Sequence, residues 1–261
     1  VCSSDLDKIT GMTKFVPNSG SMNKNFVNRA IKNSILRMCV ESLDLVQFHW
    51  WDYEDLSYLD ALEHLTNLQD EGKIRHIGLT NFDTKRMQII LEKGFRIVSN
   101  QVQYSIIDQR PQVEMEDFCK KHNIKLLAYG TVGGGLISER FLNQPEPTRI
   151  ELNTHSLQKY HNMINAWGGW KLFQKLLEAL ASIAKNHNVS IVNVATRFIL
   201  DQPCVSGVII GARLGLSQHI SDNLKTFSLK LNADEKKGIQ EIIKQSNDLY
   251  EHIGDCGSEY R

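Results

Sequence analysis

The chain has 261 residues, 30 basic and 30 acidic side chains, and 41% apolar residues. Its neutral charge balance gives no electrostatic attraction to nucleic acid or anionic membranes, and no apolar run reaches the roughly 18 to 20 residues that span a bilayer. Five scattered cysteines without a Cys-x-x-Cys pair, and histidines without close ligand spacing, argue against a disulfide scaffold and a metal site. The composition predicts a soluble, cytoplasmic protein without nucleic-acid, membrane or metal partners.

The first residues are unusual because the chain begins with Val1 and has neither a signal peptide nor a transit-like stretch. Residues 2–6 (CSSDL) are what one reading frame of a common sequencing-adapter oligonucleotide would encode. We therefore expect a truncated transcript in which residues 1–6 are not native. A processed start is the alternative.

Short apolar runs alternate with amphipathic segments along the whole chain. In chain order the pattern predicts strand 9–16, helix 23–41, strand 43–49, helix 59–70, strand 74–79, a helix capped by Asp83 or Thr84, strand 96–103, helix 111–122 and strand 124–129. An irregular connection over 136–169 with a helix at 156–166 follows, then helices 170–186 and 190–201, strand 205–210, and helices 217–224 and 233–249.

This alternation lacks any hairpin signal, so it predicts parallel strands joined by right-handed crossovers in an α/β fold. Six strands fit either an open doubly wound sheet or an eight-stranded (β/α)8 barrel whose beginning is absent. No linker or change in composition divides the chain. The pattern therefore predicts a single domain over residues 1–261.

Polar residues stand where the predicted strands end. These residues are Lys14, His49, Thr80, Asn81, Gln101, Tyr129 and Arg213. A lone lysine or histidine at such a place is more often a solvated rim residue than a catalyst. In a parallel barrel, however, the carboxyl ends of all strands open on one face, so a polar residue at each successive strand end favours a functional site.

The segments around these residues resemble the aldo-keto reductases, the NADP(H)-dependent carbonyl reductases built on a (β/α)8 barrel. They are residues 13–15, 45–50, 72–82, 100–104, 128–130, 209–213 and 221–224. Residues 72–82 resemble the family's GKIRxIGxSNF stretch, with Thr80 in place of serine. The resemblance extends from Ile9 to the last helix and implies a TIM barrel that here lacks its first two βα units, leaving about six strands.

The resemblance also implies four catalytic groups. A tyrosine donates a proton, a lysine lowers the pKa of that tyrosine, an aspartate holds the lysine, and a histidine orients or polarises the substrate carbonyl. Lys14 and His49 match the lysine and the histidine, whereas no Asp-x-x-x-x-Tyr precedes Lys14.

We therefore expect NADPH-dependent reduction of an aldehyde or ketone by a longer parent protein, and an inactive fragment here. One alternative is a non-catalytic NADPH-binding module of the same fold, acting in regulation or redox sensing. A fragment that does not fold alone is another.

An NADP(H) site is implied in the same way. Thr80, Asn81 and Gln101 match the residues that bind the nicotinamide carboxamide, and Tyr129 matches the ring that stacks on the nicotinamide. The turn of Gly130, Thr131, Val132, Gly133 and Gly134 lets backbone N–H groups approach a diphosphate closely. Arg213 matches the residue that binds the 2′-phosphate, and Asn223 the adenine contact, with Asp222 and Gln218 nearby.

Aromatic residues around the histidine suggest a substrate pocket. Trp50 is the best candidate because it follows His49 directly. For Trp51, Trp167 and Trp170, packing in the core is at least as good an interpretation.

Overall fold

The computed structural model describes residues 9–212 and 219–260, and the chain forms two compact units. Unit 1 comprises Val1–Val102, Asp117–Leu126 and Asp255–Arg261, and unit 2 comprises Gln103–Glu116 and Leu127–Gly254. The single domain expected from the sequence stays a prediction.

Six strands form one sheet in the order β1-β2-β3-β4-β5-β6. They are β1 (Met12–Phe15), β2 (Leu43–His49), β3 (Ile74–Thr80), β4 (Ser99–Gln103), β5 (Lys125–Tyr129) and β6 (Val205–Ile209). The pairings of β1 with β2, β2 with β3 and β3 with β4 are parallel, as the alternating pattern predicts. Consecutive strands are therefore neighbours in space, with β1 and β6 at the two ends of the order.

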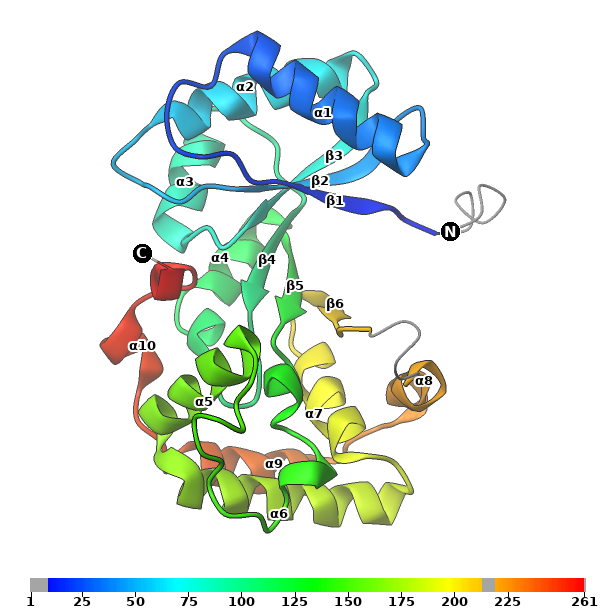
Figure 1. Cartoon of the computed structure of the whole chain (residues 1–261), viewed down its shortest axis with the longest axis vertical. Helices are drawn as coiled ribbons and strands as arrows, with labels where there is room; N and C mark the ends of the chain where they lie inside the picture. The colour runs from blue at the N-terminus through cyan, green and yellow to red at the C-terminus, as the bar shows by residue number, and fades with distance from the viewer. Residues whose placement is uncertain (1–8, 213–218, 261) are drawn as a thin grey trace. The chain divides into compact units, whose positions relative to one another are not determined.

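Helices cover one face of the strands of unit 1 (Figure 1). They are α1 (Lys24–Met38), α2 (Ser57–Asp70) and α3 (Thr84–Glu92). The Asn23 side chain accepts a hydrogen bond from the N–H of Phe26 at the start of α1, and Cys39 ends the helix in the left-handed conformation. Buried side chains such as Ile31, Phe48 and Leu62 form the core beneath these helices.

The helix expected at 111–122 is shorter than predicted. A 3₁₀ turn at Arg110–Gln112 is followed by α4 (Met115–His122). Pro111 at the second position suits the turn, because the N–H groups of the first turn have no helical partner and its missing N–H leaves no hydrogen bond unmade.

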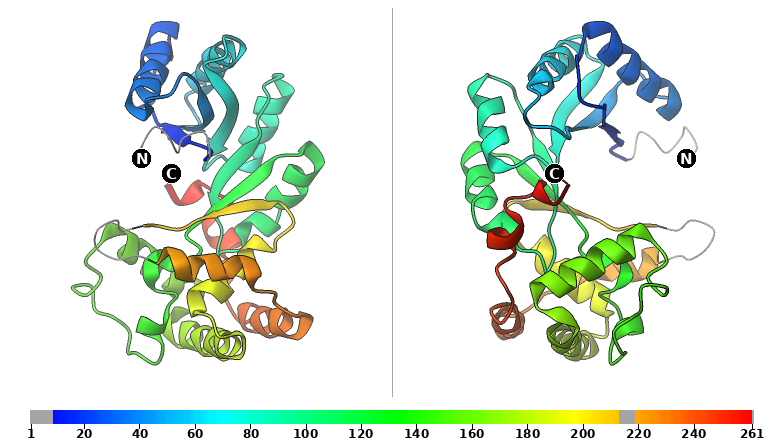
Figure 2. Two further views of the ribbon diagram at one scale, coloured as in Figure 1. Left: turned by 90° about the vertical axis from the view of Figure 1, so that its right-hand side faces the viewer. Right: turned by 60° about the vertical axis from the view of Figure 1, so that its left-hand side comes forward.

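Unit 2 is built mainly from helices around α6. They are α5 (His155–Trp167), α6 (Gly169–His187), α7 (Ile191–Leu200), α8 (Ile220–Ser228), α9 (Ala233–Ile243) and α10 (Leu249–Ile253). The long helix α6 contacts α5, α7 and α9, and Figure 2 shows α9 beside it. Its buried face includes Phe173, Leu176, Leu177 and Leu180.

The helix predicted at 233–249 is too long. The helix α9 ends at Ile243, and the separate helix α10 begins at Leu249. Asp248 caps α10 by accepting hydrogen bonds from the N–H groups of Tyr250 and Glu251. Asn247 donates its backbone N–H to Trp167 O and its side-chain amide to Ala166 O. These bonds to α5 outweigh the continuation of the helical period.

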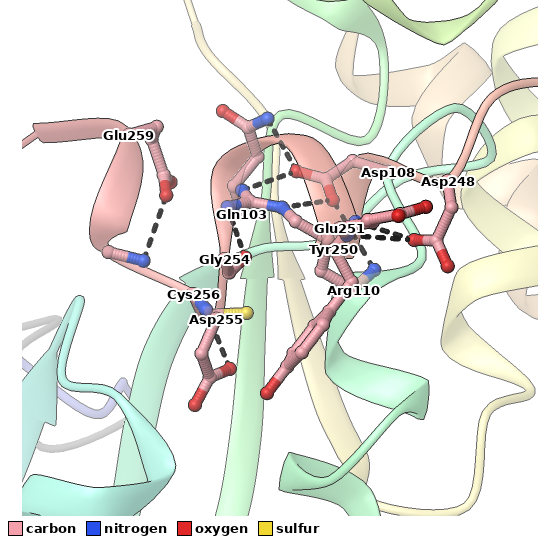
Figure 3. A network of polar contacts seen from close by, with 11 residues as sticks. Gln103, Asp108, Arg110, Asp248, Tyr250, Glu251, Gly254, Asp255, Cys256 and Glu259 are labelled. Atoms are coloured by element: carbon pink, nitrogen blue, oxygen red, sulfur yellow. Dashed lines mark hydrogen bonds and ion pairs between the residues drawn. The ribbon is translucent and has the colours of Figure 1, made fainter.

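A buried ion pair in unit 2 fastens the turn after β4 to the segment beyond α9 (Figure 3). Arg110 Nε lies 2.8 Å from Asp108 Oδ1, and Arg110 Nη2 lies 2.8 Å from Asp108 Oδ2. Gln103 donates to the same carboxylate at 2.7 Å, and Arg110 Nη1 donates to Gly254 O at 3.3 Å. The planar guanidinium thus makes a bidentate pair, the geometry that best repays the desolvation of two charges.

Candidate functional site

The register of the parallel strands brings several predicted site residues of unit 1 together. His49 pairs with Thr80, and Thr80 pairs with Gln101. Lys14 pairs with Gln47, two residues before His49 on β2, so its side chain is on the same face of the sheet. Lys14, His49, Thr80 and Gln101 therefore share one face at the carboxyl ends of β1 to β4.

His49 is held in a defined orientation. Its side chain is 3% exposed, and its Nδ1 lies 2.9 Å from the carbonyl oxygen of Thr80. Because a carbonyl only accepts, Nδ1 carries a proton and donates it to this bond. The other ring nitrogen, Nε2, accordingly accepts a hydrogen bond when the ring is neutral and donates one as imidazolium.

Lys14 is the cationic group on this face. Its side chain is still exposed, but neighbouring protein atoms displace part of the water around its ammonium. This desolvation lowers the pKa of Lys14 from its ordinary value of 10.5, because burial disfavours the charged form. The pKa of such a partly buried lysine shifts readily when a second titratable group lies beside it.

Buried polar atoms on the same strands lack hydrogen-bond partners among the residues that the structure describes. They are Gln47 Nε2, Thr80 Oγ1 and Gln101 Oε1. A buried polar atom without a partner costs free energy, so such atoms mark places where a polar ligand group fits. A carboxamide supplies a donor for Gln101 Oε1 and a partner for the Thr80 hydroxyl. These two atoms therefore suit the nicotinamide end of NADP(H).

Gln47 was not predicted as a site residue. Its signal was nevertheless present, because in β2 the polar residues Gln47 and His49 alternate with the apolar Val46 and Phe48.

Tyr53, which the sequence suggested only as a pocket aromatic, holds the turn after β3. Its hydroxyl donates to Asn81 O and accepts from the N–H of Asp83, both at 3.1 Å. The guanidinium of Arg86 lies 4.5 Å from the centre of the Tyr53 ring. These contacts fix Asn81, whose φ of 56° is uncommon for a residue with a side chain.

The burial of Trp50 contradicts the prediction that this residue lines the substrate pocket. It is 0% exposed, packs on Phe48, and donates its indole N–H to Asp55 O at 2.9 Å. Trp51 instead is 44% exposed, and its ring lies edge-on to His49 with centroids 4.3 Å apart. Side chains alternate along an extended segment, so the residue two positions after His49 shares its face.

In unit 2 the glycine-rich turn follows β5 directly. Gly130, Gly133 and Gly134 have positive φ values of 76°, 55° and 65°. The helix α5 lies against this turn: a Cβ at Gly130 would be 2.6 Å from Tyr160 Oη, and one at Gly134 would be 2.8 Å from Ser156 Oγ. The glycines are therefore needed both for the backbone conformation and for the close approach of α5.

Replacing Gly130 by alanine is expected to lower the free energy of unfolding by about 1–3 kcal/mol, the usual cost of a strained backbone conformation. The contact of the new Cβ with Tyr160 adds to this loss. Gly238→Ala is the matched control, because Gly238 is exposed in α9 with nothing near its Cβ position. That control should stabilise by up to about 1 kcal/mol. Equal effects of the two substitutions in urea titrations would contradict this account.

The remaining predicted cofactor residues divide into two groups. Asp222 and Asn223 lie in the first turn of α8, and Arg213 and Gln218 are outside the described residues. Asp222 accepts a hydrogen bond from Ser190 Oγ at 2.7 Å and pairs with Lys225 at 3.1 Å. It therefore joins α8 to the start of α7, a structural role that the sequence did not indicate.

The comparisons with known proteins identify the family. The sequence profile of the aldo/keto reductase family matches residues 3–244, so the chain belongs to this family. The structure of the glycerol dehydrogenase AKR11B4 from Gluconobacter oxydans is similar at 20% identity, with a TM-score of 0.75 over 97% of this chain and 76% of that one. An aldo/keto reductase from Klebsiella pneumoniae in complex with NADP and acetate has 20% identity and a TM-score of 0.65 over 91% of this chain and 71% of that one.

A third relative is the flagellar radial spoke protein 5 of Chlamydomonas reinhardtii. It is 34% identical over 182 residues, which are 63% of this chain and 34% of that protein. The chain thus spans about a third of the length of this relative. Within the described residues, no helix has both the length and the apolar character needed to cross a membrane.

Proposed function

We propose that this protein, in its complete form, reduces an aldehyde or ketone to an alcohol with NADPH. The observation that carries the proposal is the shared face of Lys14, His49, Thr80 and Gln101 at the strand ends. Membership of the aldo/keto reductase family supports it, as does the similar Klebsiella pneumoniae structure that holds NADP.

Different residues of this face bind the cofactor and donate to the substrate carbonyl. Bound NADPH supplies the hydride. Thr80 and Gln101 hold the carboxamide, because their unpaired buried atoms fit a group that both donates and accepts. His49, fixed through Nδ1 on Thr80 O, donates from Nε2 to the substrate carbonyl as imidazolium, and Trp51 lines the substrate side.

Lys14 acts on the proton donor. A positive charge beside a phenol stabilises the phenolate and so lowers the pKa of the phenol toward neutrality. The thirteen residues before Lys14 contain no tyrosine. We propose that the proton donor is a tyrosine outside these 261 residues, which by themselves bind the cofactor without rapid turnover.

Replacing Arg213 by alanine is expected to weaken NADPH binding by roughly 1–3 kcal/mol, the range of a charge-assisted hydrogen bond, and to leave NADH binding nearly unchanged. The reason is that only NADPH carries the 2′-phosphate assigned to this guanidinium. Titration of both nucleotides by quenching of tryptophan fluorescence measures the two affinities. Equal losses for both would overturn the assignment, and no binding of either nucleotide by the folded, unmodified chain would overturn the proposed function.

A second candidate is a non-catalytic NADPH-binding subunit of an assembly. It is favoured by the 34% identity to a protein named for a flagellar radial spoke rather than for a reaction. One measurement distinguishes the two candidates. If the protein is a non-catalytic subunit, the longest chain that the transcript encodes binds NADPH but does not oxidise it with any carbonyl compound.

A further inference from the structure

The helix α5 places a lysine beside the glycine-rich turn. Tyr160 covers the turn, because Cβ positions at Gly130 and Gly134 would lie 2.6 Å and 2.9 Å from atoms of its side chain. The ammonium of Lys159, the preceding residue on α5, lies 5.4 Å from the centre of the Tyr160 ring and 5.3 Å from that of Tyr129. Both rings adjoin the turn, so the Lys159 cation lies close to it as well.

The turn itself presents hydrogen-bond donors. Gly133, Gly135, Leu136 and Ile137 donate their N–H groups to carbonyl oxygens of the turn. The N–H groups of Thr131, Val132 and Gly134 make no hydrogen bond with any part of the chain that the structure describes. The Thr131 hydroxyl is fully buried and also lacks a partner within that part. Successive free N–H groups in a turn form a concavity that attracts anions.

We propose that Lys159 binds the diphosphate of the dinucleotide together with these backbone N–H groups. This inference rests on the proposed function, and it assigns a residue of α5, outside the motifs that indicated the cofactor site. A diphosphate carries negative charge on both phosphates, so it needs a cation as well as amide donors. The aromatic rings of Tyr129 and Tyr160 attract the ammonium of Lys159 through their faces.

The location of the diphosphate gives the inference a distinctive consequence. NADPH and NADH share the diphosphate and differ only at the 2′-phosphate. Loss of Lys159 should therefore weaken both nucleotides alike, whereas loss of Arg213 should weaken NADPH alone. Added salt should weaken binding less steeply in the variant, because one cation fewer attracts the diphosphate and is screened.

The test is titration of NADPH and of NADH against the 261-residue chain and three variants, followed by tryptophan fluorescence. Lys159→Met should raise both dissociation constants about tenfold, the effect of one charged hydrogen bond. Lys159→Arg should restore binding of both to within about threefold of the unmodified chain, since the cation is retained. Lys171→Met is the matched control, an exposed lysine on the neighbouring α6, and should change neither constant.

Two results would overturn the assignment: unchanged affinities in Lys159→Met, or a loss confined to NADPH. Circular dichroism and the melting temperature distinguish a loss of fold from a loss of binding, and the arginine variant keeps the test decisive if methionine disturbs α5. If the unmodified chain is folded by circular dichroism and binds neither nucleotide, the proposed function fails and this inference fails with it. If the unmodified chain binds both nucleotides and Lys159→Met binds them with unchanged affinities, only this inference fails.

Discussion

Lys14→Met and His49→Ala are each expected to lower kcat for aldehyde reduction by about 10²- to 10⁴-fold in the longest chain that the transcript encodes, the range of general acid–base catalysis. In the proposed mechanism Lys14 provides the charge that activates a phenol, and His49, held through Nδ1 by Thr80 O, directs Nε2 to the substrate oxygen. The unmodified 261-residue chain should show a comparable loss, because the proposed proton donor is a tyrosine outside it. The measurement is the decay of NADPH absorbance with a panel of aromatic and aliphatic aldehydes.

Controls for this prediction are an exposed lysine and an exposed histidine elsewhere. Lys32→Met on α1 and His252→Ala on α10 should leave kcat within about twofold, since surface substitutions far from a site have small effects. Reduction by the 261-residue chain at the rate of the longer one would contradict the assignment of the proton donor. Full activity of Lys14→Met or His49→Ala would contradict the roles of these two residues.

Arg110→Met is expected to lower the free energy of unfolding by about 3–5 kcal/mol, because it leaves the Asp108 carboxylate buried without its cation. Both side chains are almost completely buried, at 1% and 0% exposure. Urea unfolding monitored by tryptophan fluorescence measures the change. The double variant Asp108→Val/Arg110→Met should lose less than Arg110→Met alone, since apolar residues of similar volume replace a buried pair at little cost.

The control for this prediction is Lys244→Met, which removes an exposed pair with Glu241 on α9 and should change stability little. A small loss in Arg110→Met would show that water reaches Asp108 when the guanidinium is removed. A double variant that is as unstable as the single variant would show that the guanidinium contributes mainly through Gly254 O.

The placement of the candidate site residues of unit 1 on one face follows from strand parity. Once residues 43–49 and 74–80 are taken as neighbouring parallel strands, His49 and Thr80 fall opposite one another. Asp83 was predicted as a cap and does accept the N–H of Arg86 at 2.7 Å. Trp50 was placed wrongly for the same physical reason, since adjacent residues of an extended segment face opposite sides.

The amino-acid sequence by itself determined the six strands, most of the helices and the polar residues at the strand ends, because these follow from local periodicity and capping. Only the tertiary structure decided which distant residues contact them: Tyr53 at Asn81, Tyr160 at Gly130, and Asn247 at the carbonyls that end α5. Such contacts join residues 28 to 81 positions apart, and no local pattern encodes their pairing. They form when the packing of apolar faces sets the position of each helix, which is why α9 ends at Ile243 although the sequence predicted a helix to Leu249.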